Sequence, residues 1–199
     1  MLHRELWDFE SLVIKQSVAC VRIEMENSKL SNKIRVVVNR KKLESCEPKH
    51  VQFYRGYASA VSQTLRKPLF QKFLDWIIKL EKIEKADVTD IQVRVFPFVK
   101  ENGNPVAGRC NSTAGVILLF PKRRSFLKKK LKNSQKENVH YYLKSRAMAA
   151  MIHELLHIKY KSNEEKVRHL TKKYFGIFAW HQNFDSKTAN ASQRLMLAL

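Results

Sequence analysis

Residues 143–160 read LKSRAMAAMIHELLHIKY, and this stretch decides how the rest of the sequence is interpreted. It consists mostly of good helix formers and contains neither Gly nor Pro. Apolar side chains recur in it at helical spacing and form one expected buried stripe, made of Met148, Ile152, Leu155 and Leu156. The pattern therefore predicts a buried α-helix from Leu143 to about Tyr160.

This helix carries the pattern H-E-x-x-H at His153, Glu154 and His157. Residues four apart lie on one face of a helix, so the two imidazoles can bind one zinc ion. Glu154 is offset by one residue, which places its carboxylate near a water on the metal. Zinc lowers the pKa of such a water towards about 7, so Glu154 can act as its general base. We expect Zn²⁺ as cofactor, His153 and His157 as ligands, and Glu154 as the catalytic residue.

A catalytic zinc ion needs a third protein ligand and one coordination position left open for water. The nearest candidates downstream are Glu164, Glu165 and His169. The helix expected from Glu164 to about Phe178 has a buried stripe of Val167, Leu170, Tyr174 and Phe178. Glu164 shares that face, whereas Glu165 is in phase with exposed positions and fits a capping box with Ser162. We favour Glu164, with Glu165 as second choice and His169 or a more distant residue left open.

With two motif histidines and a glutamate, the sequence resembles the zincin metallopeptidases, in the gluzincin arrangement. The segment Gly108–Thr113, followed by Val116–Phe120 and the motif helix, also looks like small intracellular SprT-like hydrolases. The resemblance covers about residues 88–180. It implies that His153 and His157 are ligands, that Glu154 is the general base and that Glu164 is a candidate third ligand. It further implies that an extended substrate pairs with a strand edge, either Val116–Phe120 or Ile91–Phe96.

The remaining pattern predicts an α+β fold. Helices are expected over residues 1–30, over 51–65 and after Pro68, where the apolar spacing is Leu69, Phe73, Trp76, Ile77 and Leu80. Short strands are expected at Ile34–Val38, Ile91–Phe96 and Gly115–Pro121, the last two joined by a long hairpin loop. The predicted architecture is zincin-like: a small antiparallel sheet packed on the motif helix, with an N-terminal helical part.

Three regions follow from this assignment. Residues 1–87 form a mostly helical N-terminal region with one short strand and match no family that the motifs suggest. Residues 88–180 form the zincin-like catalytic core. Residues 181–199 form a polar C-terminal tail.

The charge is extreme, with a net value of +20 and a pI near 10.0. Such an excess favours anionic neighbours, nucleic acid among them. Residues 122–136 hold eight basic residues and no acid. The candidates for non-specific phosphate contact are Lys122, Arg123, Arg124, Lys128, Lys129, Lys130 and Lys132. An equally open interpretation is a solvated linker or helix face.

Other patterns narrow the function class. The sequence contains no P-loop, no G-x-G-x-x-G and no G-x-S-x-G, so nucleotide-dependent and serine-hydrolase chemistry lack support. No apolar run reaches the length of a membrane span, and the start does not resemble a signal peptide, so we expect a cytoplasmic protein without membrane contact. An oxyanion-stabilising residue is left open among Tyr141, Tyr160, Tyr174, His181 and Arg109.

The sequence thus predicts a zinc metallopeptidase that acts on a peptide or protein substrate, with nucleic-acid-associated proteins as one substrate class. The alternative is a basic nucleic-acid or ribonucleoprotein-binding module on a non-catalytic zincin-like scaffold. The sequence leaves the oligomeric state open.

Overall fold

The computed structural model describes residues 30–39, 44, 46–95, 100–101, 104–130 and 136–181. The helices are α3 (Pro48–Leu65), α4 (Pro68–Glu81), α5 (Arg124–Lys130), α6 (Lys136–Tyr160) and α7 (Glu164–His181). The strands are β1 (Ile34–Val37), β2 (Asp90–Arg94), β3 (Lys100–Glu101), β4 (Asn104–Pro105), β5 (Gly108–Asn111) and β6 (Val116–Leu119). Two short 3₁₀ turns, Ser31–Lys33 and Lys85–Asp87, complete this part of the chain. The helix predicted within residues 1–30 and the tail predicted over 181–199 lie outside it, except at positions 30 and 181.

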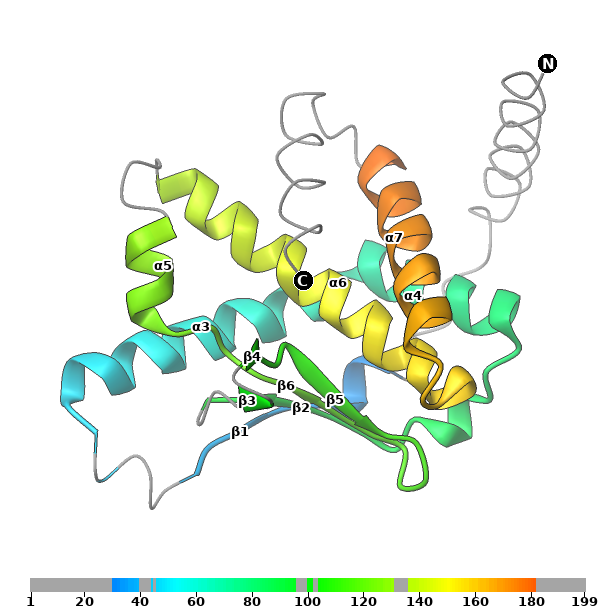
Figure 1. Cartoon of the computed structure of the whole chain (residues 1–199), viewed down its shortest axis with the longest axis horizontal. Coiled ribbons are helices and arrows are strands. Elements are labelled where there is room, and N and C mark those ends of the chain that lie inside the picture. Colours follow the sequence, from blue (N-terminus) through cyan, green and yellow to red (C-terminus); the bar gives the residue numbers. More distant parts are fainter. Residues whose placement is uncertain are drawn as a thin grey trace.

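The main sheet has the strand order β1-β2-β6-β5 and is mixed (Figure 1). β1, β2 and β6 are parallel, and only β5 runs antiparallel, against β6. The α+β class is confirmed, but the predicted antiparallel sheet is wrong. The reason is that Gly108–Asn111, expected to be loop, is itself a strand. It takes the antiparallel place beside β6, so β6 returns parallel to β2 instead of forming a hairpin with it.

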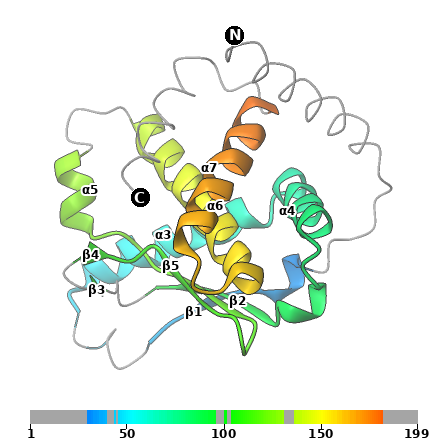
Figure 2. The same cartoon turned by 45° about the vertical axis from the view of Figure 1, so that its right-hand side comes forward.

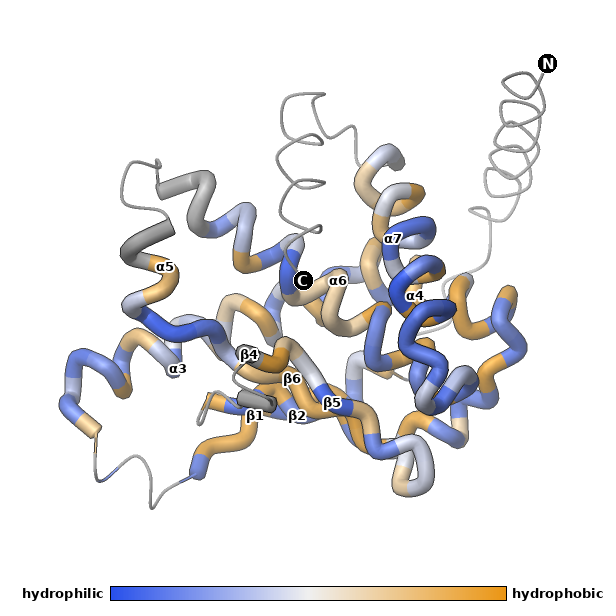
Figure 3. The backbone as a smooth tube through the Cα atoms, in the orientation of Figure 1, coloured by the Kyte–Doolittle hydropathy of each residue, from blue (hydrophilic) through white to orange (hydrophobic). Residues whose placement is uncertain are grey.

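The sheet presents one face to the helices. Alternate strand residues are buried, among them Ile34, Ile91, Val93, Ile117 and Leu119. α6 and α7 lie on the same side of the sheet in both views (Figures 1 and 2), and α3 contacts β1 and β2. Figure 3 shows hydrophobic residues along the strands, and hydrophobic and hydrophilic residues alternating along α7. Residues on both sides of position 87 contribute to this sheet.

Proline begins both α3 and α4, at the first helical position, where its missing N–H costs nothing. The helix predicted over 51–65 is confirmed as α3, and the predicted restart at Pro68 is confirmed as α4. The stripe predicted for α4 is displaced, because Leu69 and Leu80 are about half exposed. The buried residues are instead Phe70, Gln71, Leu74, Ile77, Ile78 and Glu81. Both stripes have helical spacing, and only packing decides which of them faces the core.

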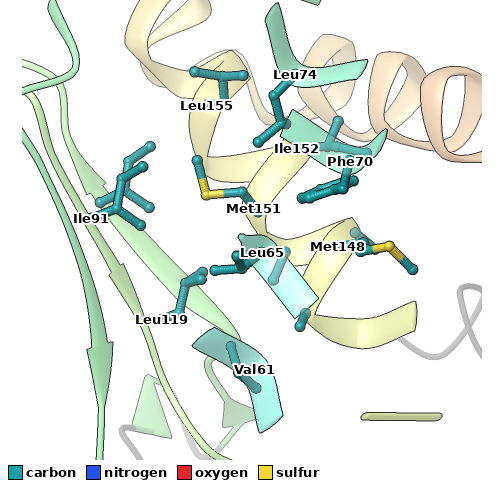
Figure 4. Close-up of a cluster of buried hydrophobic side chains, with 14 of the residues drawn as sticks. Val61, Leu65, Phe70, Leu74, Ile91, Leu119, Met148, Met151, Ile152 and Leu155 are labelled. Atoms are coloured by element: carbon teal, nitrogen blue, oxygen red, sulfur yellow. The ribbon is translucent and has the colours of Figure 1, made fainter. Parts of the chain in front are cut away.

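α6 is the central element of the core. The predicted stripe is confirmed: Met148, Ile152, Leu155 and Leu156 are all buried. Figure 4 shows Met151 and Ile152 between the sheet residues Ile91 and Leu119 and the α4 residues Phe70 and Leu74, with Val61 and Leu65 of α3 beside them. Because α6 contacts α3, α4, α7, β5 and β6, its position is fixed on several sides. In the described part of the chain, no helix combines the length and apolar content needed to cross a bilayer.

Glu81 joins the end of α4 to the end of α6 and to the middle of α7. Its side chain is buried, and the Tyr160 hydroxyl donates to Oε2 at 2.6 Å. The Tyr174 hydroxyl donates to Oε1, and the Lys159 ammonium lies 3.3 Å from Oε2. Burial raises the pKa of Glu81, but these donors lower it more, so it lies below the ordinary value of 4.5. The ionised carboxylate is therefore the form that the fold stabilises.

We expect Glu81→Gln to lower the free energy of unfolding by about 1–3 kcal/mol at neutral pH, because the buried Tyr174 hydroxyl and its neighbouring donors lose a charged acceptor. The pKa of Glu81 is lower in the folded state than its ordinary value of 4.5. The stability that ionised Glu81 adds to the wild type is therefore complete above pH 4.5 and is lost as the pH falls through the lower, folded pKa. Urea unfolding of both proteins across this pH range measures it. The exposed Glu84→Gln serves as control. A constant difference between wild type and Glu81→Gln down to strongly acidic pH would contradict this assignment.

Candidate metal centre

The site lies where α6 ends and α7 begins. α6 continues through the H-E-x-x-H pattern to Tyr160, and Lys161 then adopts a left-handed conformation with φ 49°. The Asn163 side chain accepts the Lys166 amide at 3.1 Å and so caps α7. The predicted capping box on Ser162 and Glu165 is therefore wrong. The short turn brings the first residue of α7, Glu164, back to the histidines of α6.

Three potential ligands converge at this turn. His153 Nε2 and His157 Nε2 are 3.1 Å apart. Glu164 Oε1 lies 3.6 Å from His153 Nε2, and Oε2 lies 3.3 Å from His157 Nε2. Among the described residues, this is the one group of three or more His, Cys, Asp or Glu side chains close enough to share a metal ion. Ligand atoms about 2.0–2.1 Å from a tetrahedral zinc lie about 3.3–3.4 Å from one another, so the spacing suits such an ion.

Hydrogen bonds on the far side of each ring indicate which nitrogen carries the proton. His157 Nδ1 contacts the Lys161 backbone carbonyl, which can only accept, so Nδ1 bears the hydrogen. The Thr171 hydroxyl donates to the Val167 carbonyl at 2.7 Å, which leaves its oxygen to accept from His153 Nδ1 at 3.4 Å. A ring that carries its hydrogen on Nδ1 alone has its lone pair on Nε2, and the two Nε2 atoms face each other.

Burial lowers the pKa of His153 to about 4, with Glu164 opposing the shift and His157 adding to it. His153 is therefore neutral at neutral pH, which is the form that binds metal. The Nε2 atoms of the two histidines and the Glu164 carboxylate oxygens face one another, and each of these atoms can accept a hydrogen bond. A cation at their centre would resolve that repulsion, so the residues present fit a zinc ion.

Glu154 directly follows His153 in the chain and lies on the side of α6 that faces β5. It is buried, 6% exposed, and a Cβ built on Gly108 would come within 2.6 Å of its Cγ and Oε1. Glycine at this strand position therefore makes room for the carboxylate. Burial and the charge of Glu154 raise the pKa of the Cys110 thiol to about 12. Cys110 is thus a protonated neighbour of Glu154 and belongs to no ligand group among the described residues.

The other candidates lie away from the histidines. Glu165 and His169 are exposed on α7 and lie outside the ligand group. Tyr160 and Tyr174 donate their hydroxyls to Glu81. Tyr141 is twelve residues before His153, about 18 Å along the helix. Because Gly108 and Cys110 face Glu154, Arg109 between them points to the opposite face of the sheet. The side chain of His181 lies outside the described residues, so the structure selects no oxyanion-stabilising residue.

The predicted basic patch is only partly described. Lys122 is buried, 8% exposed, with its ammonium 5.2 Å from the centre of the Phe126 ring. Arg123 is exposed and Arg124 is half-buried. The side chains of Lys128, Lys129 and Lys130, and the whole of Lys132, lie outside the described residues. Phosphate contact through this run stays a prediction.

Thr171, the Lys161 carbonyl and Gly108 were not identified from the sequence. Thr171 lies seven residues after Glu164, two turns along the same face of α7, so its spacing was a usable signal. The Lys161 carbonyl carries no sequence signal, because any residue in a left-handed turn would supply it. Comparison of the chain with protein-family models, with curated proteins and with solved structures finds no match.

Proposed function

We propose that this protein is a zinc-dependent metallopeptidase with a zincin-like arrangement. The observation that carries the proposal is the convergence of the His153 and His157 lone pairs with the Glu164 carboxylate. His153, His157 and Glu164 would hold the ion, and zinc bound there would polarise the scissile carbonyl and acidify a water. Glu154, on the same helix, would act as general base: its carboxylate would accept a proton from the attacking water and return it to the leaving amine nitrogen.

The edge strand β5 supports a polypeptide substrate. Both strands first considered for substrate pairing, Ile91–Phe96 and Val116–Phe120, are interior to the sheet as β2 and β6, so neither has an open edge. The prediction that one of these two strands pairs with the substrate is therefore wrong. Among the described strands β5 pairs only with β6, and its Gly108 lies against Glu154. An extended peptide that adds to the open edge of β5 would run beside the general base.

A neutral chelator tests this proposal directly. We expect wild-type protein to cleave unfolded, dye-labelled casein, to lose this activity in phenanthroline, and to regain it when zinc is restored but not when magnesium is. The reason is that two imidazoles and one carboxylate suit zinc, whereas magnesium prefers oxygen ligands. Fluorescence release from the casein measures the rate. Full activity in the chelator would contradict the proposal.

The second candidate, a nucleic-acid-binding module, is favoured by the net charge of +20 and by exposed basic residues on and near α7. They are Lys161, Lys166, Lys172 and Lys173. Such a module would bind nucleic acid with steep salt dependence and would be indifferent to substitution of Glu154. The two candidates are therefore separated by the same Glu154 variant that tests the mechanism.

A further inference from the structure

One side of α4 carries a line of apolar side chains that stay partly exposed. Leu69 is 49% exposed and Leu80 is 51% exposed. Phe73 and Trp76, between them in sequence, are half-buried, and their rings stack with centroids 5.3 Å apart. The four residues are spaced by four, three and four positions, so they lie along one face of the helix. These four residues are called the outer face of α4 below.

α7 covers only part of the outer face. α4 lies beside α7 (Figure 2), with the Phe178 ring 4.9 Å from the Phe73 ring and the Tyr174 ring 5.7 Å from the Trp76 ring. The two leucines at the ends of the face keep about half of their surface exposed. α4 thus has one apolar side against the core and a second, partly open apolar side. An exposed apolar line of this kind marks a contact site.

The described chain begins close to the end of α4. Leu30, its first residue, is 1% exposed. The Lys33 ammonium donates to the backbone carbonyls of Lys85 and Val88, which follow the last residue of α4 by four and seven positions. Residues 1–29 therefore join the fold near this helix. α4 has 14 residues and is about 21 Å long, so a preceding segment of 29 residues can run along all of it.

The sequence of residues 1–29 provides a matching apolar stripe. Leu2, Leu6, Phe9 and Val13 are spaced by four, three and four positions, which is the spacing of the outer face itself. These residues belong to the helix predicted over residues 1–30. A lone helix of this length is only marginally stable in water, so its apolar stripe needs another element to pack against.

Charge favours this segment over a second copy of the chain. Lys72 and Lys79 are exposed and lie three or four positions from members of the outer face, so they border it. Two outer faces packed together would bring these lysines near one another, in a chain whose net charge of +20 already opposes self-association. Residues 1–29 contain five acidic and four basic residues. The segment can therefore approach the lysines without this repulsion.

We propose that residues 1–29 dock as a helix on the outer face of α4, with the stripe of Leu2, Leu6, Phe9 and Val13 covering that face. The contact is within one chain. α4 would then be packed on both of its apolar sides. This inference depends on the fold and on the sequence of the segment, and it is independent of the proposed zinc chemistry.

Hydrogen exchange of the full chain, measured by mass spectrometry, tests the docking. A lone helix protects its amides little, whereas a docked helix protects them strongly. We expect amides of residues 2–15 in the wild type to exchange at least about tenfold more slowly than in an unfolded chain. Leu69→Gln with Leu80→Gln removes apolar surface but keeps good helix formers, so it should lower this protection by about tenfold or more.

Two further variants make the test specific. Leu69→Met with Leu80→Met keeps the apolar surface and should keep the protection. Leu6→Gln with Phe9→Gln leaves the described fold untouched and should lose the protection, so the test stands even if the α4 variant unfolds. Unchanged exchange of α6 peptides shows that a variant is folded.

Three results would overturn the proposal. The first is wild-type exchange in residues 2–15 as fast as in an unfolded chain. The second is equal protection of these residues in the wild type and in both folded Gln variants. The third is protection that disappears on dilution, because it would show that a second copy holds the segment.

Discussion

Glu154→Gln should reduce peptide hydrolysis by about a hundred- to ten-thousandfold while the protein keeps its zinc. The amide is nearly isosteric with the carboxylate and fits the same buried space against Gly108. The amide cannot accept a proton from the attacking water, so the variant would lack the proposed general base. Hydrolysis of dye-labelled casein, with zinc content measured on the same samples, shows both effects.

Glu165→Gln is the matched control, because it removes an equal charge from an exposed position and should leave the rate unchanged. A zinc-loaded Glu154→Gln protein that hydrolyses casein at the wild-type rate would exclude Glu154 as general base. Retained nucleic-acid binding with no hydrolysis in either protein would favour the binding-module alternative.

Glu164→Ala should weaken zinc binding by more than about a hundredfold, while Glu165→Ala should change it little. Substitution of a residue that only orients a metal ligand typically reduces metal affinity by about 10–100-fold. Substitution of a ligand itself should therefore have a larger effect. Glu164 is 3.3–3.6 Å from the two histidine Nε2 atoms, whereas Glu165 lies outside the ligand group. Competition with a chromophoric chelator at neutral pH measures both dissociation constants.

The two variants are closely matched. Both residues lie in the first turn of α7, where a carboxylate favours the helix dipole, so both lose the same helix stabilisation. Glu164→Ala also loses the surface pair with Arg168, which is worth little. Equal zinc affinities in the two variants would show that Glu164 is not the third ligand.

The candidate site was largely predictable because the residues that form it are close together in the sequence. The 3.6-residue period places His153 and His157 on one face of α6, and the next turn of chain supplies Glu164. The reasoning that chose Glu164 was partly wrong, since Asn163 rather than Ser162 caps α7. Glu164 was also favoured because it shares a face of α7 with Val167, and Val167 is buried as predicted.

The sheet was less predictable because strand pairing is not local. Gly108–Asn111 is small and polar in sequence, and only its pairing with β6 makes it a strand. Parallel pairing of β1 with β2 requires a crossover, which α3 and α4 supply over more than fifty residues. Arg146 shows the same limit. The two hydrogen-bond partners of its guanidinium, Tyr57 and Phe120, come from distant parts of the chain, so no local pattern predicts its burial.

The most direct test of the metal centre is the metal content of full-length protein purified without added metal, with His153→Ala prepared in parallel. Elemental analysis should find about one zinc per chain in the wild type and almost none in the variant, because His153 would supply one of the three proposed ligands. Wild-type protein that contains no zinc and takes up none at neutral pH would contradict the account. Iron in place of zinc would also contradict it, since two histidines and one carboxylate can bind Fe(II) as well.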